Sequence, residues 1–181
     1  MRGKTTKELL GESFRELAGY KPISKITIAN ITERCGVTHP TFYNHFRDKY
    51  DLMAWLYTSD VQKIMNRIGH DGYQWRNTLS DGMRYFAERK KELLNAFKHT
   101  GGRDAFMNYM MKINIDILCA EIRKQMENIP DDLLMMIKIY CYGTVIYICE
   151  WVTDNMPVSP EKAAAIMEKC LPEPLRSYLY L

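Results

Sequence analysis

The chain has 181 residues, 46% of them hydrophobic, and this length allows one well-formed core together with a small additional domain. Its five cysteines are odd in number and include no CxxC pair, which excludes a complete disulfide framework. The formal net charge is +3, but residues 1–50 carry nine Lys and Arg against five acids, so the positive charge lies at the start of the chain, where it can attract an anionic partner.

Two stretches near the start predict a compact group of helices. A helix is predicted over residues 6–18, and residues 26–49 predict two short helices joined by a tight turn and followed at once by a third. In the second stretch, Thr27 is a good N-cap with Asn30 three positions later. Gly36 suits the left-handed backbone that ends a helix, so it marks the turn.

The helix after this turn has a small apolar face and a crowded polar face. Thr38 predicts its N-cap, and Pro40 lies in its first turn, where a missing N–H costs nothing. Phe42 and Phe46 are four residues apart and therefore share the apolar face. The polar side chains are Thr38, His39, Thr41, Tyr43, Asn44 and His45. Such a helix, placed after a glycine-containing turn, is typical of one that enters a DNA major groove.

The remaining sequence predicts only helices and has no strand pattern. A fourth helix over residues 48–68 ends at the glycine-rich turn 69–72, which is the best domain boundary. Further helices are predicted over residues 75–90, 91–98, 104–128 and 133–152, and after a cap at Ser159. The predicted fold class is therefore all-α. It has an N-terminal three-helix helix-turn-helix domain over residues 1–50 and a helical C-terminal domain over residues 73–181, linked by the fourth helix.

Residues 133–152 are mostly apolar and long enough to be compared with a membrane span. Lys138 and Glu150 interrupt the segment, and charges inside a span are costly. We interpret it as a helix buried on two sides, one in its own domain and one at a subunit contact. The N-terminus lacks the apolar segment of a signal peptide, so we expect a cytoplasmic protein with no membrane partner.

At this point the sequence resembles a known family. The DNA-binding domain of the TetR family of bacterial transcription regulators is similar in Ile26-Thr27-Ile28, Ile31, Cys35-Gly36-Val37, Thr41-Phe42-Tyr43, His45-Phe46 and Lys49, and upstream in Leu9, Leu10, Phe14, Leu17 and Lys21-Pro22-Ile23. The resemblance covers about the first quarter of the chain, and the rest matches in length and helical character. It implies a DNA-binding regulator whose C-terminal domain binds an effector and dimerises. His39-Pro40 departs from many members, so no operator sequence can be carried over.

The candidate DNA-binding residues fall into two groups. Base contacts are predicted for Thr38, His39, Thr41 and Asn44, because Asn suits adenine and Thr can touch a thymine methyl group. The resemblance implies phosphate contacts for Tyr43 and His45. Lys49 is expected to pair with a phosphate. Thr27, together with the N-terminus of the helix that it caps, is expected to help bind phosphate. The alternative for His45 and Tyr43 is that they mainly pack between helices.

The C-terminal domain is rich in Met, Tyr and Trp, and an effector pocket between its helices is one reading. The candidate lining residues are Phe106, Met110, Asn114, Tyr140, Thr144 and Tyr147. The alternative is a filled core. The pattern Phe97…Gly101-Gly102…Phe106 also resembles regulators of the dihydroxyacetone-kinase branch, some of which respond to a protein coactivator.

The sequence contains no catalytic constellation. Its four histidines lack metal-ligand spacing, and neither a GxSxG elbow nor a phosphate-cradling loop is present, so no metal or cofactor is expected. We predict a homodimeric repressor that binds double-stranded operator DNA and is released by a small-molecule effector. One alternative is an activator controlled by a protein partner. A small helical enzyme is the alternative from another class, and the missing acid–base and metal groups argue against it.

Overall fold

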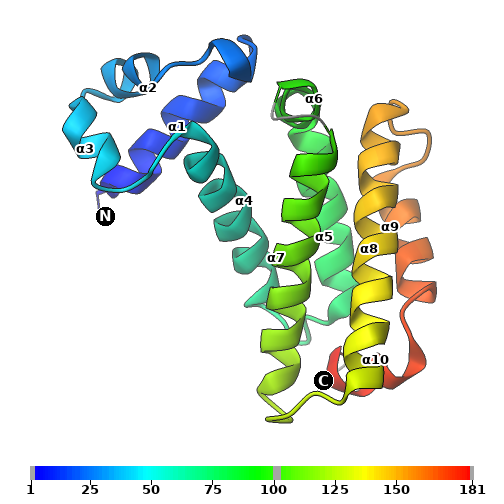
Figure 1. Ribbon diagram of the computed structural model, residues 1–181. Helices are drawn as coiled ribbons and strands as arrows, with labels where there is room; N and C mark the ends of the chain where they lie inside the picture. Colours follow the sequence, from blue (N-terminus) through cyan, green and yellow to red (C-terminus); the bar gives the residue numbers. More distant parts are fainter. Residues whose placement is uncertain (1–2, 100–102, 180–181) are drawn as a thin grey trace. The chain divides into compact units, whose positions relative to one another are not determined.

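A computed structural model describes residues 3–99 and 103–179, and within these ranges it contains α-helices, one 3-10 turn and no strand, which confirms the all-α prediction (Figure 1). The elements are α1 (Thr6–Ala18), η1 (Ile23–Lys25), α2 (Ile28–Cys35), α3 (His39–Tyr43), α4 (Lys49–Met65), α5 (Trp75–Glu88), α6 (Lys90–His99), α7 (Arg103–Arg123), α8 (Asp131–Thr153), α9 (Pro160–Lys169) and α10 (Glu173–Leu179).

The chain forms two compact units. One unit contains Met1–Ser59 with Lys91–Phe106, and the other contains Asp60–Lys90 with Met107–Leu181. We call them the reader unit and the helical unit. These limits divide the chain differently from the predicted domains, because most of α6 belongs to the reader unit. The continuous helices α4, α6 and α7 each pass from one unit to the other.

One side chain accounts for the position of α6. The Nδ2 atom of Asn95 donates hydrogen bonds to the carbonyl oxygens of Ala18 and Lys21, both at 2.7 Å. Its Oδ1 atom accepts one from the backbone N–H of Ile23 at 2.9 Å. Asn95 thus satisfies backbone groups where α1 ends and η1 begins, groups that would otherwise need water.

The reader unit is built on α1, whose apolar face is buried. Thr5 and Glu8 form a capping box at the start of this helix, and Leu10 and Phe14 are fully buried on its inner side. Ser13 donates a hydrogen bond from its hydroxyl to the carbonyl of Ile31 at 2.7 Å, which joins α1 to α2. A short buried polar contact of this kind sets how far α2 can slide along α1.

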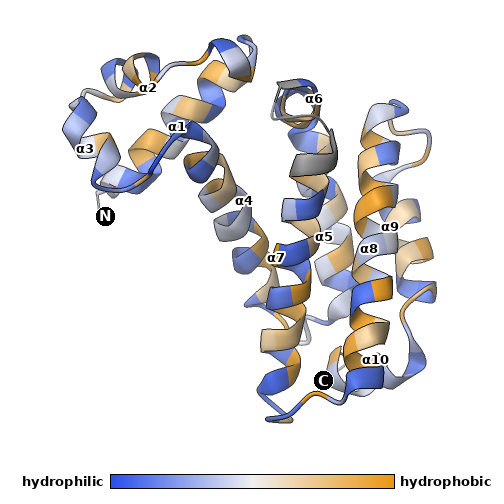
Figure 2. Ribbon diagram, viewed as in Figure 1, coloured by the Kyte–Doolittle hydropathy of each residue, from blue (hydrophilic) through white to orange (hydrophobic). Residues whose placement is uncertain are grey.

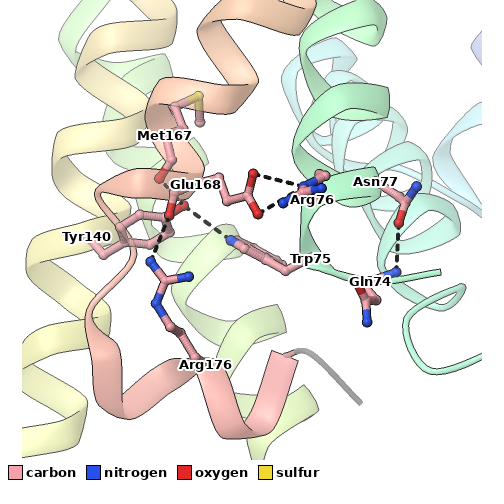
Figure 3. Close-up of polar contacts among 8 residues, drawn as sticks. All are labelled: Gln74, Trp75, Arg76, Asn77, Tyr140, Met167, Glu168 and Arg176. Atoms are coloured by element: carbon pink, nitrogen blue, oxygen red, sulfur yellow. Dashed lines mark hydrogen bonds and ion pairs between the residues drawn. The ribbon is translucent and has the colours of Figure 1, made fainter. Parts of the chain in front are cut away.

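The helical unit is cross-linked by polar side chains around a large apolar core. Helix α5 packs against both α8 and α9. The Nε1 atom of Trp75 donates to the hydroxyl of Tyr140 at 3.2 Å, and that hydroxyl donates to the carbonyl of Met167 at 3.1 Å (Figure 3). Arg76 binds both carboxylate oxygens of Glu168, each at 3.0 Å. One tyrosine and one ion pair therefore hold α5, α8 and α9 in register.

Helix α8 has 23 residues and is long and apolar enough to cross a membrane by length and composition alone. Lys138 and Glu150, which interrupt the apolar part of this helix, are exposed, and a span would have to place both in lipid. Leu133, Ile137 and Val145 are buried in the helical unit. This pattern is that of a helix with one face in a protein core.

The elements predicted from local signals agree closely with the structure. The helix predicted over residues 6–18 is α1, and the N-caps predicted at Thr27, Thr38 and Ser159 all accept the expected backbone hydrogen bond. Three helices end earlier than the sequence suggests: α4 ends at Met65 instead of residue 68, α5 ends at Glu88 instead of residue 90, and α7 is also shorter. The helix predicted to reach residue 128 ends at Arg123 in 3-10 turns. The Gly101-Gly102 break lies outside the described residues.

Candidate nucleic-acid interface

The start of α2 has first-turn backbone N–H groups beside a polar cap. The Thr27 side chain accepts from the backbone N–H of Asn30 at 3.1 Å, and the Asn30 side chain accepts from the backbone N–H of Thr27 at 3.2 Å. The capping box leaves the remaining first-turn N–H groups of α2 for an anion. Thr27 itself is exposed, as a phosphate contact requires.

The turn between α2 and α3 depends on one glycine. Gly36 has φ 71° and ψ 27°, the left-handed region that non-glycine residues rarely adopt. The backbone N–H of Val37 then donates to the carbonyl of Thr32 at 3.0 Å, which closes the end of α2. This geometry was predicted from the sequence, and it fixes the direction in which α3 leaves the turn.

The short helix α3 separates an anchored face from an exposed one. Phe42 is fully buried and Phe46 nearly so, with their ring centroids 5.9 Å apart. On the other side His39 and Asn44 are exposed, and Tyr43 is 59% exposed. The backbone N–H groups of residues 44–46 still bond helically to α3, so the exposed positions continue past its end at Tyr43.

Among the predicted base-reading residues, His39 and Asn44 are both exposed, and the Asn44 amide is open to contact. No hydrogen bond to the Asn44 side chain is made by any residue that the structure describes. Thr38 and Thr41 instead bind each other, with their hydroxyl oxygens 2.8 Å apart, and the Thr38 hydroxyl also accepts from the Thr41 backbone N–H at 3.3 Å. A free amide is suited to adenine, whereas the paired threonines are held in one orientation.

Lys49 is engaged by the protein itself. Its Nζ atom donates to the carbonyls of Ile23, Ser24 and Ile26 at 2.6, 3.2 and 2.8 Å. Burial lowers the pKa of Lys49, and the nearby charge of Lys21 lowers it further. All three donors of the ammonium group are therefore used, so the predicted phosphate contact would have to share or replace one of these bonds.

Two further predicted residues have dual environments. His45 is half-buried, with its ring 6.4 Å from that of Phe46, while Tyr43 lies edge-on to Phe42 at 5.5 Å. Both side chains therefore pack against the anchored face and still reach the surface. The structure is compatible with either role that the sequence suggested for them.

Sequence reasoning missed a role for Lys21. Its Nζ atom donates to the Oδ1 atom of Asn30 at 2.6 Å and so places an ammonium group at the start of α2. That position adds positive charge to the same helix end that Thr27 caps. Lys21 had been used only as part of a sequence match, because nothing local in the sequence links it to a residue nine positions later.

The six candidate effector residues do not all meet in one place. Phe106 is buried in the reader unit against Tyr57 and Phe97, whereas the other five lie in the helical unit. Met110 is fully buried, and the hydroxyl of Tyr140 is occupied by Trp75 and Met167 (Figure 3). The Thr144 hydroxyl donates within its own helix, and Asn114 and Tyr147 are half-buried.

An open pocket of about 520 Å³ does lie between α7 and α8, and other residues line it. They are Asn108, Met111, Lys112, Ile115, Asp116, Tyr142 and Ile146. The sequence could have suggested α7 for this pocket, because Asn108, Lys112 and Asp116 follow one another at helical spacing.

Comparison with known proteins decides the family. Residues 14–55 match the family described as bacterial regulatory proteins, tetR family, and residues 73–173 match one described as transcriptional regulator C-terminal region. The chain belongs to the TetR family. It is therefore a transcriptional regulator with a helix-turn-helix DNA-binding domain, and not an enzyme. The two matched segments bracket the turn at residues 69–72.

Sequence relatives match only part of their own length. The activator DhaS of the dhaKLM operon from Lactococcus lactis is 26% identical over 85 residues, which are 47% of this chain and 45% of DhaS. An uncharacterized HTH-type regulator from Mycobacterium tuberculosis is 32% identical over 50 residues, 28% of this chain and 26% of that protein. The alignments thus span less than half of the length of these relatives.

Solved structures share the fold over nearly the whole chain. The dihydroxyacetone kinase operon activator DhaS has a TM-score of 0.65 at 19% identity, covering 97% of this chain and 98% of that one. A TetR regulator from Streptococcus agalactiae has a TM-score of 0.62 at 16% identity, covering 93% and 94%. At these identities the likeness supports the TetR fold alone.

Proposed function

We propose that this TetR-family regulator binds operator DNA as a homodimer and that an effector bound by the helical unit changes its affinity for DNA. The observation that carries the DNA-binding part is the exposed polar face of α3, opposite the fully buried Phe42. A rigidly anchored helix with free polar side chains is what base reading requires, because a mobile helix would lose entropy on docking.

The contacts are proposed to divide by chemistry. Thr38, His39, Thr41 and Asn44 face the bases, while Thr27, Tyr43, His45 and Lys49 contact phosphates. The free amide of Asn44 supports its role as a base reader. The ammonium group of Lys21, beside the N-terminus of α2, adds positive charge that supports the proposed phosphate contacts there.

The experiment that tests this proposal is selection of bound sequences from random DNA by the full-length protein. We expect a near-palindromic site whose half-sites lie about one helical turn or more apart, ~34–36 Å for the simplest docking. Enrichment of no preferred sequence, with binding that depends only on salt, would show that α3 does not read bases.

An apolar stripe on α8 supports the homodimer. Figure 2 shows many hydrophobic residues along α8. Met135, Ile139, Tyr142 and Ile146 are 61%, 65%, 43% and 39% exposed, and their spacing of four, three and four places them on one face of the helix. On the neighbouring helix α9, Ile166 is 45% exposed. A contiguous apolar surface of this kind is typical of a protein interface, and a two-fold axis lets the same stripe cover itself.

Gly143 lies within this stripe and favours close contact between two helices. A Cβ atom placed there would meet no atom within 4 Å, so the position is open in the single chain. A second copy of α8 can approach most closely where no side chain intervenes. Sedimentation of the protein should therefore give about twice the chain mass of 21.3 kDa.

Regulation is proposed to act through α4. This helix begins with Lys49 in the reader unit and continues into the helical unit, so an effector that favours one arrangement of α4 changes the DNA-binding state. We favour a repressor released by a small molecule. The second candidate is an activator controlled by a protein partner, and the similarity to DhaS, which is named as an activator, supports the activating role. We expect the protein to act in the bacterial cytoplasm.

A further inference from the structure

A second pocket lies within the reader unit, on the side formed by α6 and the loop after α1. It has a volume of about 330 Å³ and is lined by residues 18–22 of the loop and by one face of α6. All of its charged lining residues are lysines: Lys21, Lys91 and Lys98. Tyr20, which is 68% exposed, adds a hydroxyl group at the rim.

The walls of this lysine pocket are held in place by Asn95. Lys91, Asn95 and Lys98 share one face of α6 because they are four and three residues apart. The three hydrogen bonds of Asn95 to the backbone of Ala18, Lys21 and Ile23 join that face to the loop. The pocket is thus preformed, and ligand contact falls to the ammonium groups because the Asn95 amide is already bonded.

The positive charge in the pocket is not neutralised by the protein. Lys91 and Lys98 are exposed, and within the described part of the chain neither makes an ion pair. The acid next to Lys91, Glu92, lies 3.9 Å from Arg15. Lys21 bonds to a neutral amide, that of Asn30. The two lysines of α6, with Lys21 in the loop wall, give the pocket a positive potential that an anion relieves.

We propose that the lysine pocket binds a phosphate-bearing anion, which bridges Lys21 of the loop to Lys91 and Lys98 of α6. The phosphate group can come from a free small molecule or from the DNA backbone beside the operator. Either source fastens α6 more firmly to the segment that leads into α2. The site differs from the effector site proposed above, which belongs to the helical unit.

The first arm of the test uses inorganic pyrophosphate and the full-length protein without DNA. Calorimetric titration should detect binding, and the double variant Lys91→Gln with Lys98→Gln should bind roughly tenfold more weakly or worse, because charge-assisted hydrogen bonds are lost. The matched control is Lys63→Gln with Lys162→Gln, which removes the same charge from exposed lysines of the helical unit and should bind pyrophosphate normally.

The second arm measures DNA affinity against salt concentration. If the phosphate belongs to DNA, the plot of log affinity against log salt should be less steep for the lysine-pocket variant, by ~1.8, which is two lost contacts at ~0.9 each. The control variant should leave the slope unchanged. A pyrophosphate response or a slope change confined to the pocket variant supports the proposal and identifies the source.

The proposal is overturned if the lysine-pocket variant matches wild type in both arms, or if the control variant changes as much as the pocket variant. Specific operator binding is measured in the same experiments and depends on α3. If the protein reads its operator but does not bind pyrophosphate, and the pocket variant leaves the salt dependence of DNA affinity unchanged, only the lysine-pocket proposal is disproved. Loss of sequence preference would instead count against the proposed function.

Discussion

The exposed faces of α3 and α8 differ in chemistry, although both helices are anchored by buried apolar side chains. Helix α3 buries Phe42 and exposes a polar face that continues to the Asn44 amide, whereas α8 buries Ile137 and Val145 and exposes an apolar stripe. A polar exposed face keeps its hydrogen-bonding groups for base edges, while an apolar one gains free energy only when another apolar surface covers it. The comparison supports the proposals that α3 contacts DNA and that α8 contacts a second protein surface.

The two units also differ in how they are held together. In the reader unit, short helices are capped between residues three apart, such as Thr27 and Asn30, and the side chains of Ser13 and Asn95 add hydrogen bonds to distant residues. In the helical unit, long helices are fixed by contacts between distant residues, such as Trp75 with Tyr140. Local caps set the direction of each helix, and distant contacts set the register between helices. The reader unit therefore combines local caps with distant contacts, whereas distant cross-links dominate in the helical unit.

The largest expected effect is in the core beneath α3. Phe42→Ala should destabilise the reader unit by ~3–5 kcal/mol, because it removes a fully buried ring and leaves a cavity. The neighbouring change Tyr43→Ala, at a side chain 59% exposed, should cost less than ~1 kcal/mol. Urea unfolding of both variants checks the difference. Equal losses would mean that α3 is not anchored by one face.

The next effect concerns the apolar stripe of α8. Gly143→Arg should leave the single chain folded, because the Cβ position is open, but it places a charge against the second copy. We expect the dimer dissociation constant to rise about a hundredfold, ~3 kcal/mol. Gly82→Arg in α5 is the control, since its Cβ would also meet no atom within 4 Å. Analytical ultracentrifugation distinguishes the two variants, and a Gly143→Arg protein that stays dimeric would move the interface away from this stripe.

Removing one oxygen tests the cross-links of the helical unit. Tyr140→Phe leaves the indole N–H of Trp75 and the carbonyl of Met167 without their partner, so unfolding should become ~1–3 kcal/mol easier. Tyr147→Phe is the control, because the structure assigns no hydrogen bond to that half-buried hydroxyl within the described residues. Thermal unfolding measures both variants. Identical stability in the two would show that the Tyr140 hydroxyl does not hold the helices in register.

Base reading by α3 should appear as a change in preference. Asn44→Ala should cost ~1–3 kcal/mol at one operator position and leave affinity for random DNA unchanged, because a base contact is lost. Tyr43→Phe should instead weaken operator and random DNA alike, since its hydroxyl is assigned to a phosphate. Fluorescence anisotropy with operator variants separates the two. An equal loss of affinity for operator and random DNA in Asn44→Ala would mean that Asn44 contacts a phosphate and not a base.

Local features of the fold could be predicted from the sequence, and distant contacts could not. The caps at Thr27 and Thr38 and the turn at Gly36 each depend on residues within a few positions, so the residue types themselves carry the information. Asn95 binds Ile23, 72 residues away, and Lys49 binds Ile23, 26 residues away. An asparagine on an amphipathic helix and a lysine at a helix start gave no sign of these partners.

The candidate sites divide in the same way. The exposed polar face of α3 follows from helical spacing, and the structure places Tyr43 and Asn44 on the surface as expected. The effector residues were chosen for their types alone. In the structure, Phe106 lies in a different unit from Tyr140. The Tyr140 hydroxyl already makes hydrogen bonds within the helical unit.

The smallest expected effect concerns the turn that joins α3 to α4. The Asp51 carboxylate accepts hydrogen bonds from the backbone N–H of Arg47 at 3.0 Å and from its guanidinium at 3.2 Å. The backbone hydrogen bond, followed by the side-chain one, lowers the pKa of Asp51 below its ordinary value of 3.8. A lowered pKa means that the folded state favours the carboxylate. The stabilisation is therefore complete above pH 3.8 and is lost as the pH falls through the lower, folded-state pKa.

Asp51→Asn should remove this pH-dependent contribution. Because Arg47 is almost fully exposed, we expect a difference in unfolding free energy of no more than ~1 kcal/mol at neutral pH. The difference should shrink towards zero in strong acid, where wild-type Asp51 is protonated and resembles the amide. Asp154→Asn is the control, because it removes an exposed carboxylate from the helical unit. Its unfolding free energy for the reader unit should equal that of wild type at every pH. Urea unfolding across the acid range makes the comparison, and a gap that widens on acidification would reverse the sign argued here. The result would also show whether the stability of the turn after α3 depends on the charge of Asp51.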